Sequence, residues 1–271
     1  MQQTRSQLPS SDRIGILIAS VLLTFALSHF VQSPGLTLSL SLPGFYYAFP
    51  ITIGSFMTLF AAALTAAGMD WIIRDHPALA EKRSHLEHLL LPTLTAFVIG
   101  TPLSLLADSP AWNWGFLLAA VLLAAVCIAE YISLDPSAPV SGFARAGLKA
   151  VAYALFLTLV ISLRFAGARM ILVTPYIFVV AGLISLRILH LDGEDHWDFP
   201  WAIGIGLVCA QVGAGLHYWT LSPVQFGLAI TGLIYGLTLF SASLAEDVPI
   251  RRAVVGPVIV IGAAWVAAIF L

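Results

Sequence analysis

The sequence has few charged residues. Asp, Glu, Lys and Arg make up only 10% of its 271 residues, whereas 59% are hydrophobic, and the mean hydropathy is +0.95. A water-soluble globule of this size needs more polar surface, so the composition excludes that class and predicts a membrane protein with membrane lipids as partners. The net charge is −2 with histidine neutral. No basic surface large enough for nucleic acid is expected, so we predict no nucleic-acid partner.

Cysteines and catalytic motifs are also scarce. The two cysteines, Cys127 and Cys209, both fall in apolar runs, where a free cysteine behaves as a small hydrophobic residue. No disulfide framework follows from them. The sequence has no nucleophile elbow, phosphate-binding loop, dinucleotide fingerprint or HExxH motif. The sequence therefore favours a protein that is not an enzyme, but it does not exclude an enzyme.

Long apolar runs are what the sequence has instead. Each is long enough to cross about 30 Å of hydrocarbon at about 1.5 Å per residue. They predict an all-α, polytopic bundle of about nine transmembrane helices, in a single domain over residues 13–271 that follows a tail over residues 1–12. The predicted spans are 13–32, 46–70, 88–107, 112–133, 145–164, 169–188, 199–219, 222–244 and 253–271.

The positively charged residues predict the orientation, because Lys and Arg are held on the cytoplasmic side during insertion. With nine spans, only Arg164 and Arg169 fall on one side. The N-terminal tail is therefore predicted in the cytoplasm and the C-terminus outside, in a multi-pass protein of the bacterial cytoplasmic (inner) membrane. The opposite side carries Arg5, Arg13, Arg74, Lys82, Arg83, Arg145, Lys149, Arg187, Arg251 and Arg252.

A short segment between the first two spans has the period of a strand. Residues 36–42, LTLSLSL, alternate strictly between apolar and polar, and a Pro-Gly pair stands on each side. We predict a short extended segment on the outer face, because unpaired backbone is not tolerated inside lipid. The alternative is a loop that alternates by chance.

Small residues recur at helical spacing in several spans. Residues 202, 206, 210 and 214 are all Gly or Ala, residues 232 and 236 form GxxxG, and Ala recurs at 146, 150 and 154. Such patterns let helix backbones approach closely, and we expect them to hold the bundle together. Pro102, Pro175 and Pro257 are expected to bend their helices.

The middles of the predicted spans carry no Asp, Glu, Lys or Arg. Charge at that depth is costly and is usually kept only for function, so the chain lacks the usual signature of a proton relay or an ion-coupled transporter. Gln211 is the most polar residue in mid-span and is a candidate intramembrane site. A hydrogen bond between helices is the simpler interpretation of it than substrate binding.

The predicted cytoplasmic face gathers histidines and acids. One group follows the second span and opens the third, and another lies in HLDGEDHWDFPW, residues 190–201, after the sixth. Glu130, at the inner end of the fourth span, joins them if the bundle brings these ends together. The candidate cytoplasmic polar cluster is Asp70, Arg74, Asp75, His76, His88, Asp192, Asp195 and His196.

A metal ion at these residues is one interpretation. Asp192, Asp195 and Asp198 are spaced by three, but Gly193 and Pro200 favour a turn over a continuing helix. Zinc at His190 or His196 lacks the usual ligand pairs. We therefore expect no cofactor, with magnesium or zinc as the alternative, and interpret the segment mainly as a hydrated hairpin whose acids offset neighbouring positive charges.

The general plan resembles the intramembrane aromatic prenyltransferase superfamily, which has nine spans, an inside N-terminus and acidic clusters after spans two and six. The resemblance implies magnesium held by aspartates in a DxxxD motif. Here Asp70 and Asp75 are five residues apart, about 140° around a helix, and do not share a face. Arg74 lies at i+4 from Asp70 and predicts an ion pair instead.

Short motifs carry a second resemblance, to an uncharacterised, domain-of-unknown-function family of bacterial polytopic membrane proteins. They are RDHP at 74–77, HLLLP at 88–92, GLHYWTLSPVQFG at 215–227, and the Arg251 and Arg252 pair before the last helix. This resemblance implies a polytopic membrane protein and no particular activity. The function predicted is a binding, scaffold or complex-forming membrane component, whose protein partners stay open. The alternatives are a transporter or lipid-handling protein, and a metal-dependent prenyltransferase-like enzyme.

Overall fold

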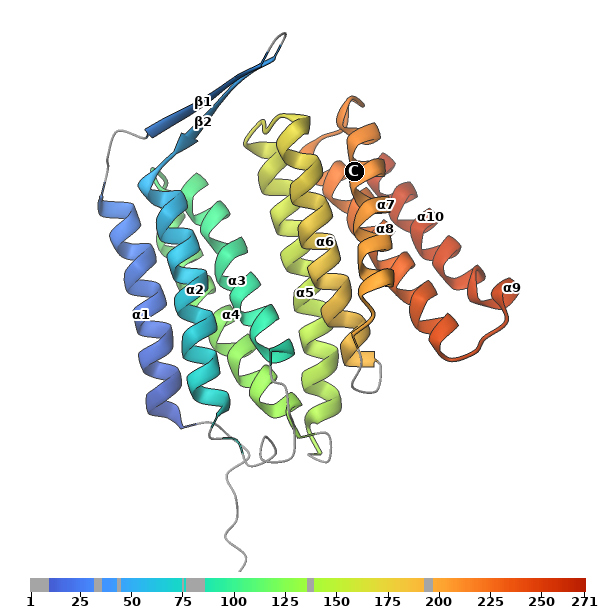
Figure 1. Cartoon of the computed structure of the whole chain (residues 1–271), viewed down its shortest axis with the longest axis horizontal. Coiled ribbons are helices and arrows are strands. Elements are labelled where there is room, and N and C mark those ends of the chain that lie inside the picture. The colour runs from blue at the N-terminus through green and yellow to red at the C-terminus, as the bar shows by residue number, and fades with distance from the viewer. Residues whose placement is uncertain are drawn as a thin grey trace, which may run out of the picture. The chain divides into compact units, whose positions relative to one another are not determined.

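The computed structural model describes residues 10–31, 36–42, 45–74, 76, 86–135, 139–192 and 197–271, and within them the chain is almost entirely helical (Figure 1). Nine helical segments of this described part are long and apolar enough to cross a membrane, with α9 and α10 forming one segment. The predicted nine-helix, multi-pass membrane protein is therefore confirmed. The helices are α1 (Ser11–Phe30), α2 (Ile53–Ile73), α3 (Glu87–Leu105), α4 (Trp112–Ser133), α5 (Ser141–Phe165), α6 (Met170–Asp192), α7 (Phe199–His217), α8 (Pro223–Ala245), α9 (Ile250–Ala253) and α10 (Val255–Phe270).

Local signals explain where two helices begin. Ser222 Oγ accepts a hydrogen bond from the Gln225 amide at 3.2 Å, and Gln225 Oε1 accepts one from the Ser222 amide at 2.8 Å. Pro223 stands at the first position of α8, where its missing amide hydrogen costs nothing. At α2, Thr52 Oγ1 accepts from the Ser55 amide at 3.2 Å. Both helices therefore start at side chains that satisfy their first amides.

A β-hairpin joins α1 to α2. Strand β1 (Leu36–Leu42) has the bounds predicted for the extended segment, which confirms its extended conformation, while its place on the outer face stays a prediction. It pairs antiparallel with β2 (Phe45–Ile51), with Leu36 opposite Ile51 and Leu42 opposite Phe45. The prediction that the second span begins at residue 46 is wrong. The aromatic run FYYAF favours a strand, and the helix starts only at Ile53, after Pro50.

Contacts between Cα atoms divide the chain into two compact units, Met1–Ala144 and Arg145–Leu271, here called unit 1 and unit 2. Each is described by itself. The prediction of a single domain after a tail over residues 1–12 stays a prediction, since residues 1–9 lie outside the described part.

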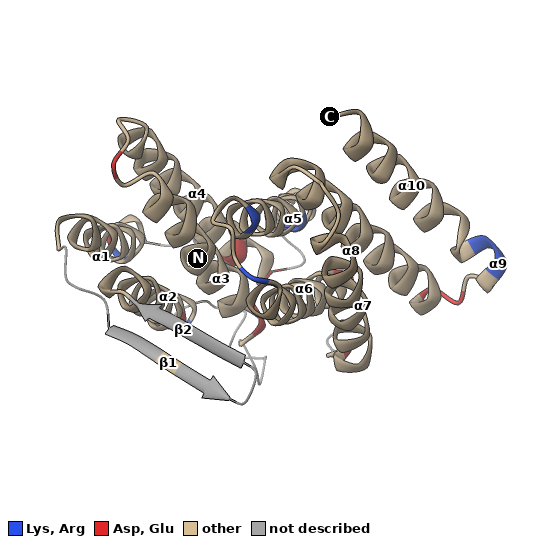
Figure 2. Cartoon of the chain, turned by 90° about the horizontal axis from the view of Figure 1, so that it is seen from above, with Lys and Arg blue, Asp and Glu red and all other residues tan. Residues whose placement is uncertain are grey.

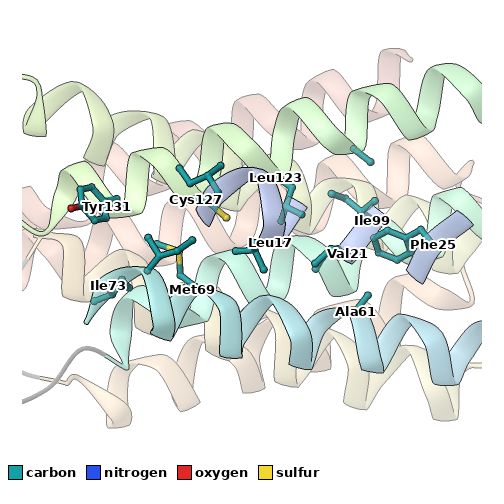
Figure 3. Packing of buried hydrophobic residues seen from close by; sticks show 14 of the residues in the cluster. Leu17, Val21, Phe25, Ala61, Met69, Ile73, Ile99, Leu123, Cys127 and Tyr131 are labelled. Atoms are coloured by element: carbon teal, nitrogen blue, oxygen red, sulfur yellow. The ribbon is translucent and has the colours of Figure 1, made fainter. Parts of the chain in front are cut away.

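Unit 1 is a four-helix arrangement. α1 packs against α2 and α4, α2 packs against α3, and α3 packs against α4. Leu17 and Val21 of α1 lie among Met69 of α2 and Leu123 and Cys127 of α4, all 3% exposed or less (Figure 3). The prediction that Cys127 is a packing residue is confirmed, because its side chain belongs to this hydrophobic cluster.

Unit 2 is held by close contacts at glycines. α6 packs against α7, α7 against α8, and α8 against α10. A Cβ atom at Gly206 would lie 2.7 Å from the Phe178 carbonyl oxygen, and one at Gly232 would overlap Ala264. The predicted role of these glycines in packing is confirmed. The Ala repeat at 146, 150 and 154 does not show the packing role expected of it, because all three residues are exposed in the structure.

Turns and prolines complete the fold. Gly167, in the turn between α5 and α6, has a φ of +65°, a conformation that glycine adopts without steric cost. This turn separates two predicted spans that are only four residues apart in the sequence. The last span is divided at Val254, three residues before Pro257, as expected where a proline ring removes a helical hydrogen bond. α3 continues through Pro102, and α6 through Pro175.

Long stretches of the helices carry no charge (Figure 2).

Candidate functional site

The Asp70 carboxylate, at the end of α2, is held by an arginine. Its Oδ2 lies 2.6 Å from Arg74 Nη2, one helical turn away, and the two side chains are 23% and 67% exposed. This confirms the ion pair that the sequence predicts and places a cation on the carboxylate that a prenyltransferase-like metal site would use. Asp75 lies outside the described residues.

A buried polar cluster crosses from α3 to α4 in unit 1. His88 Nδ1, at the start of α3, lies 2.9 Å from Glu130 Oε2, near the end of α4. Ser133 Oγ donates to the Glu130 carbonyl oxygen at 2.9 Å and lies 3.4 Å from both Glu130 Oε2 and His88 Nδ1. The three residues, here called the His88–Glu130 cluster, are 5%, 0% and 3% exposed. The structure thus brings Glu130 onto His88, as the sequence suggested for the inner helix ends.

His76 lies beside this cluster. Its ring meets Tyr131 edge to face, with centroids 4.5 Å apart, and the residue is 8% exposed. Burial lowers the pKa of His76, Asp135 raises it less, and nearby His88 lowers it further. His76 is therefore neutral at neutral pH and packs as an aromatic ring. Together these contacts join the start of α3 to the end of α4 in unit 1, and the polar groups between them are buried from solvent.

Asp192, the last residue of α6, forms an ion pair with Lys149 of α5 in unit 2. Their side chains are 37% and 30% exposed, so this pair remains accessible. Next to it, the rings of His190 and Trp197 stack with centroids 5.1 Å apart. Asp195 and His196 lie outside the described residues. Because Asp70 and His88 belong to unit 1 and Asp192 to unit 2, the joining of the acidic segments into one site stays a prediction.

The Lys149–Asp192 pair borders a cavity of about 340 Å³ between α5, α6 and α8, here called the α5–α6–α8 groove. Tyr153 and Thr238 line the same groove, and their hydroxyl oxygens lie 2.6 Å apart in a hydrogen bond. The Tyr235 ring meets Tyr153 edge to face at 5.0 Å between centroids. The rest of the lining is apolar: Ala146, Ala150, Ile188, Leu239 and Ala242. The groove therefore combines an ion pair and hydroxyls with an apolar wall.

Sequence reasoning missed Lys149, Tyr153 and Thr238 as site residues. A local signal existed, because Lys149 and Tyr153 are spaced by i, i+4 and Tyr235 and Thr238 by i, i+3, which puts each pair on one helix face. The spacing does not predict that these two helix faces contact each other, because Tyr153 and Thr238 are 85 residues apart in the sequence.

Gln211 is exposed on α7. The described part of the chain supplies no hydrogen-bond partner to its amide, so the interhelical hydrogen bond expected from the sequence does not form within that part. Its role as an intramembrane site stays a prediction.

The described residues contain no group of three or more His, Cys, Asp or Glu side chains placed to hold a metal ion. Because Asp75, Asp195 and His196 lie outside the described residues, the expectation of no cofactor, with magnesium or zinc as the alternative, stays a prediction.

Comparisons with known proteins support one of the two resemblances. No match was found among curated proteins or among solved structures. The resemblance to the prenyltransferase superfamily is not shown by them. The family model described as "Protein of unknown function (DUF5656)" matches residues 33–271, nearly the whole chain. The chain therefore belongs to the DUF5656 family, as the resemblance to a domain-of-unknown-function family of membrane proteins indicates.

Proposed function

We propose that this membrane protein is a lipid-binding component of the bacterial cytoplasmic membrane, and that its α5–α6–α8 groove takes the headgroup of a phospholipid. One observation carries the proposal. An accessible Lys149–Asp192 ion pair and the Tyr153–Thr238 hydroxyl pair border one cavity of about 340 Å³ whose other walls are apolar. Clefts that bind small amphipathic molecules have this composition, with a few polar groups on an apolar lining.

The ion pair favours a headgroup that carries both charges. A phosphate accepts hydrogen bonds from Lys149, and an ammonium donates to Asp192, so a zwitterion replaces both partners at once. An anionic headgroup would pair with Lys149 and leave the Asp192 carboxylate without its cation, which is unfavourable in a partly buried site. The ligand class that fits is therefore a phospholipid with a phosphate and a primary amine, as in phosphatidylethanolamine.

The apolar part of the groove suits the start of an acyl chain. Tyr235 and Leu239 line the groove and are 41% and 36% exposed, so an acyl chain that leaves the groove there meets apolar surface. The Thr238 hydroxyl donates to the Ile234 carbonyl oxygen at 3.0 Å, so Tyr153 is the donor of the 2.6 Å bond, and both oxygens offer lone pairs at the polar border of this surface. With the predicted orientation, the groove faces the inner leaflet.

Binding to the full-length chain tests this function. The protein is placed in phosphatidylcholine nanodiscs that contain increasing fractions of phosphatidylethanolamine or phosphatidylglycerol, and bound lipid is counted by native mass spectrometry. We expect phosphatidylethanolamine to bind better, and Lys149→Ala to lower its affinity about tenfold because one charge-assisted contact is lost. Arg251→Ala, which removes an exposed cation of unit 2 outside the groove, is the matched control and keeps the affinity.

Two outcomes contradict the proposal. One is equal binding of both lipids by the wild-type protein. The other is a Lys149→Ala variant that is folded, as judged by circular dichroism, and binds phosphatidylethanolamine as well as Arg251→Ala does. The transporter alternative needs a polar cavity near Gln211, and the prenyltransferase-like alternative needs Asp70 or Asp75 to face Asp192 or Asp195. Both stay predictions.

A further inference from the structure

Unit 1 contains a cavity of about 510 Å³ at the end of the bundle where α1 and α3 end and α2 and α4 begin. It shares no described lining residue with the α5–α6–α8 groove, whose described lining residues all belong to unit 2. We call it the α1–α4 cavity, and the predicted topology puts it on the outer face. Its lining is Phe25, Ser28, His29, Phe30, Gly54, Thr58, Gly100, Leu103, Ser104, Ala107, Asp108 and Trp112.

The hydroxyl groups of this cavity have already used their hydrogens. Ser28 Oγ donates to the Phe25 carbonyl oxygen at 2.7 Å, Thr58 Oγ1 to that of Gly54 at 2.9 Å, and Ser104 Oγ to that of Thr101 at 2.7 Å. A hydroxyl has one hydrogen and two lone pairs, so only the lone pairs remain available on each oxygen. Asp108 adds a carboxylate, which only accepts. The three hydroxyls and the carboxylate of the cavity therefore present acceptors, beside the ring N–H groups of His29 and Trp112.

The charge of the lining has one sign. Among the described residues that line the cavity, Asp108 is an acid and none is Lys or Arg. His29 stacks on Trp112 with ring centroids 4.2 Å apart, and its Nδ1 is buried without a hydrogen-bond partner in the described part of the chain. Phe25 and Leu103, 4% and 6% exposed, supply apolar wall. A ligand for this lining carries a positive charge, several donors and a short alkyl part.

We infer that the α1–α4 cavity binds a primary ammonium compound, R–NH₃⁺, with Asp108 as its counter-ion and the hydroxyls of Ser28, Thr58 and Ser104 as acceptors. A primary ammonium group has three donors, which matches a site of acceptors. A quaternary ammonium brings the charge without donors, and an alcohol brings a donor without the charge. Selectivity among these three classes follows from the lining alone and does not depend on the lipid groove of unit 2.

Isothermal titration calorimetry on the full-length protein in detergent tests the inference, with heats into empty micelles subtracted. The probes are n-butylammonium chloride, tetramethylammonium chloride and 1-butanol. We expect saturable binding of n-butylammonium and at least about tenfold weaker binding of the other two, because each lacks either the donors or the charge. Asp108→Asn is expected to weaken n-butylammonium binding about tenfold, since it removes the charge and keeps the shape.

A matched control and a second variant keep the test decisive. Asp247→Asn removes another exposed acid, in the turn after α8 of unit 2 at a φ of 57° that Asn tolerates, and should leave binding unchanged. Ser104→Ala removes one acceptor on an exposed residue and should weaken n-butylammonium binding about threefold. This variant replaces Asp108→Asn in the test if Asp108→Asn does not fold. The inference is overturned if n-butylammonium does not bind, if 1-butanol binds as well, or if the folded Asp108→Asn or Ser104→Ala variant matches Asp247→Asn.

Discussion

The two units each join neighbouring helices through an acid and a base, but they place the pair differently. In unit 1, His88 and Glu130 have side chains that are 6% and 0% exposed, and Ser133 lies beside them. In unit 2, Lys149 and Asp192 are 30% and 37% exposed and border a cavity. A closed pair cannot change partners without opening the bundle, whereas an open pair can. The difference therefore separates a structural polar cluster from a candidate binding site within one chain.

The units also differ in how their helices approach. In unit 2 a Cβ atom at Gly206 would meet the backbone of α6, 2.7 Å from the Phe178 carbonyl oxygen, whereas in unit 1 one at Gly68 or Gly100 would meet a side chain, that of Leu17 or Thr58. In the membrane, where lipid tails are as apolar as leucine, such close packing replaces the hydrophobic driving force. The α6–α7 contact of unit 2 therefore does not depend on the accessible Lys149–Asp192 pair, which joins α5 to α6.

Removing the buried acid of unit 1 should have the largest effect on stability. Glu130→Ala removes the buried carboxylate that pairs with His88 and is expected to lower the free energy of unfolding by about 3 kcal/mol. Unfolding in mixed micelles, followed by circular dichroism, measures this. Glu246→Ala, an exposed acid after α8, is the control and should change it by less than about 0.5 kcal/mol. A Glu130→Ala variant as stable as the control would mean that the closed cluster is not structural.

A methyl group at Gly206 should have the next largest effect. Its Cβ would lie 2.7 Å from the Phe178 carbonyl oxygen, so Gly206→Ala is expected to lower the free energy of unfolding by about 2 kcal/mol through overpacking. Gly204→Ala is an internal control on the same helix, because nothing lies within 4 Å of its added Cβ. It should be neutral or slightly stabilising, since alanine favours helix. The glycine account of unit 2 fails if the two variants unfold alike.

The smallest effect is expected at the hydroxyl pair of the groove. Tyr153→Phe removes the 2.6 Å hydrogen bond to Thr238, and interhelical hydrogen bonds in membrane proteins contribute about 0.6 kcal/mol on average. Tyr235→Phe, whose ring lines the same groove, is the control. Equal unfolding free energies of the two variants, each measured against wild type in mixed micelles, would show that the hydroxyl pair adds nothing to stability.

Local patterns predicted much of the fold and little of the groove. Hydrophobic runs predicted nine spans, strict alternation predicted β1, and i, i+4 spacing predicted the Asp70–Arg74 ion pair. Each depends on residues close in sequence. The second strand was missed, because an aromatic apolar run fits a strand as well as the start of a helix.

The contacts that make the candidate sites join residues far apart in the chain. Lys149 and Asp192 are separated by 43 residues, and His88 and Glu130 by 42. Hydrophobicity and spacing tell which face of a helix is polar but not which neighbour meets that face. Only the packing of the bundle supplies that information, so Asp192 was predicted as a candidate without its partner Lys149.

The most direct test of the proposal that the α5–α6–α8 groove binds lipid is the identity of the lipid that stays on the wild-type protein. The full-length chain is extracted from membranes with a mild detergent, and its retained lipids are compared by mass spectrometry with those of the Lys149→Ala variant and of the starting membrane. The groove predicts phosphatidylethanolamine enriched on the wild-type protein and lost from Lys149→Ala. Retained lipids that match the membrane composition in both proteins would contradict it.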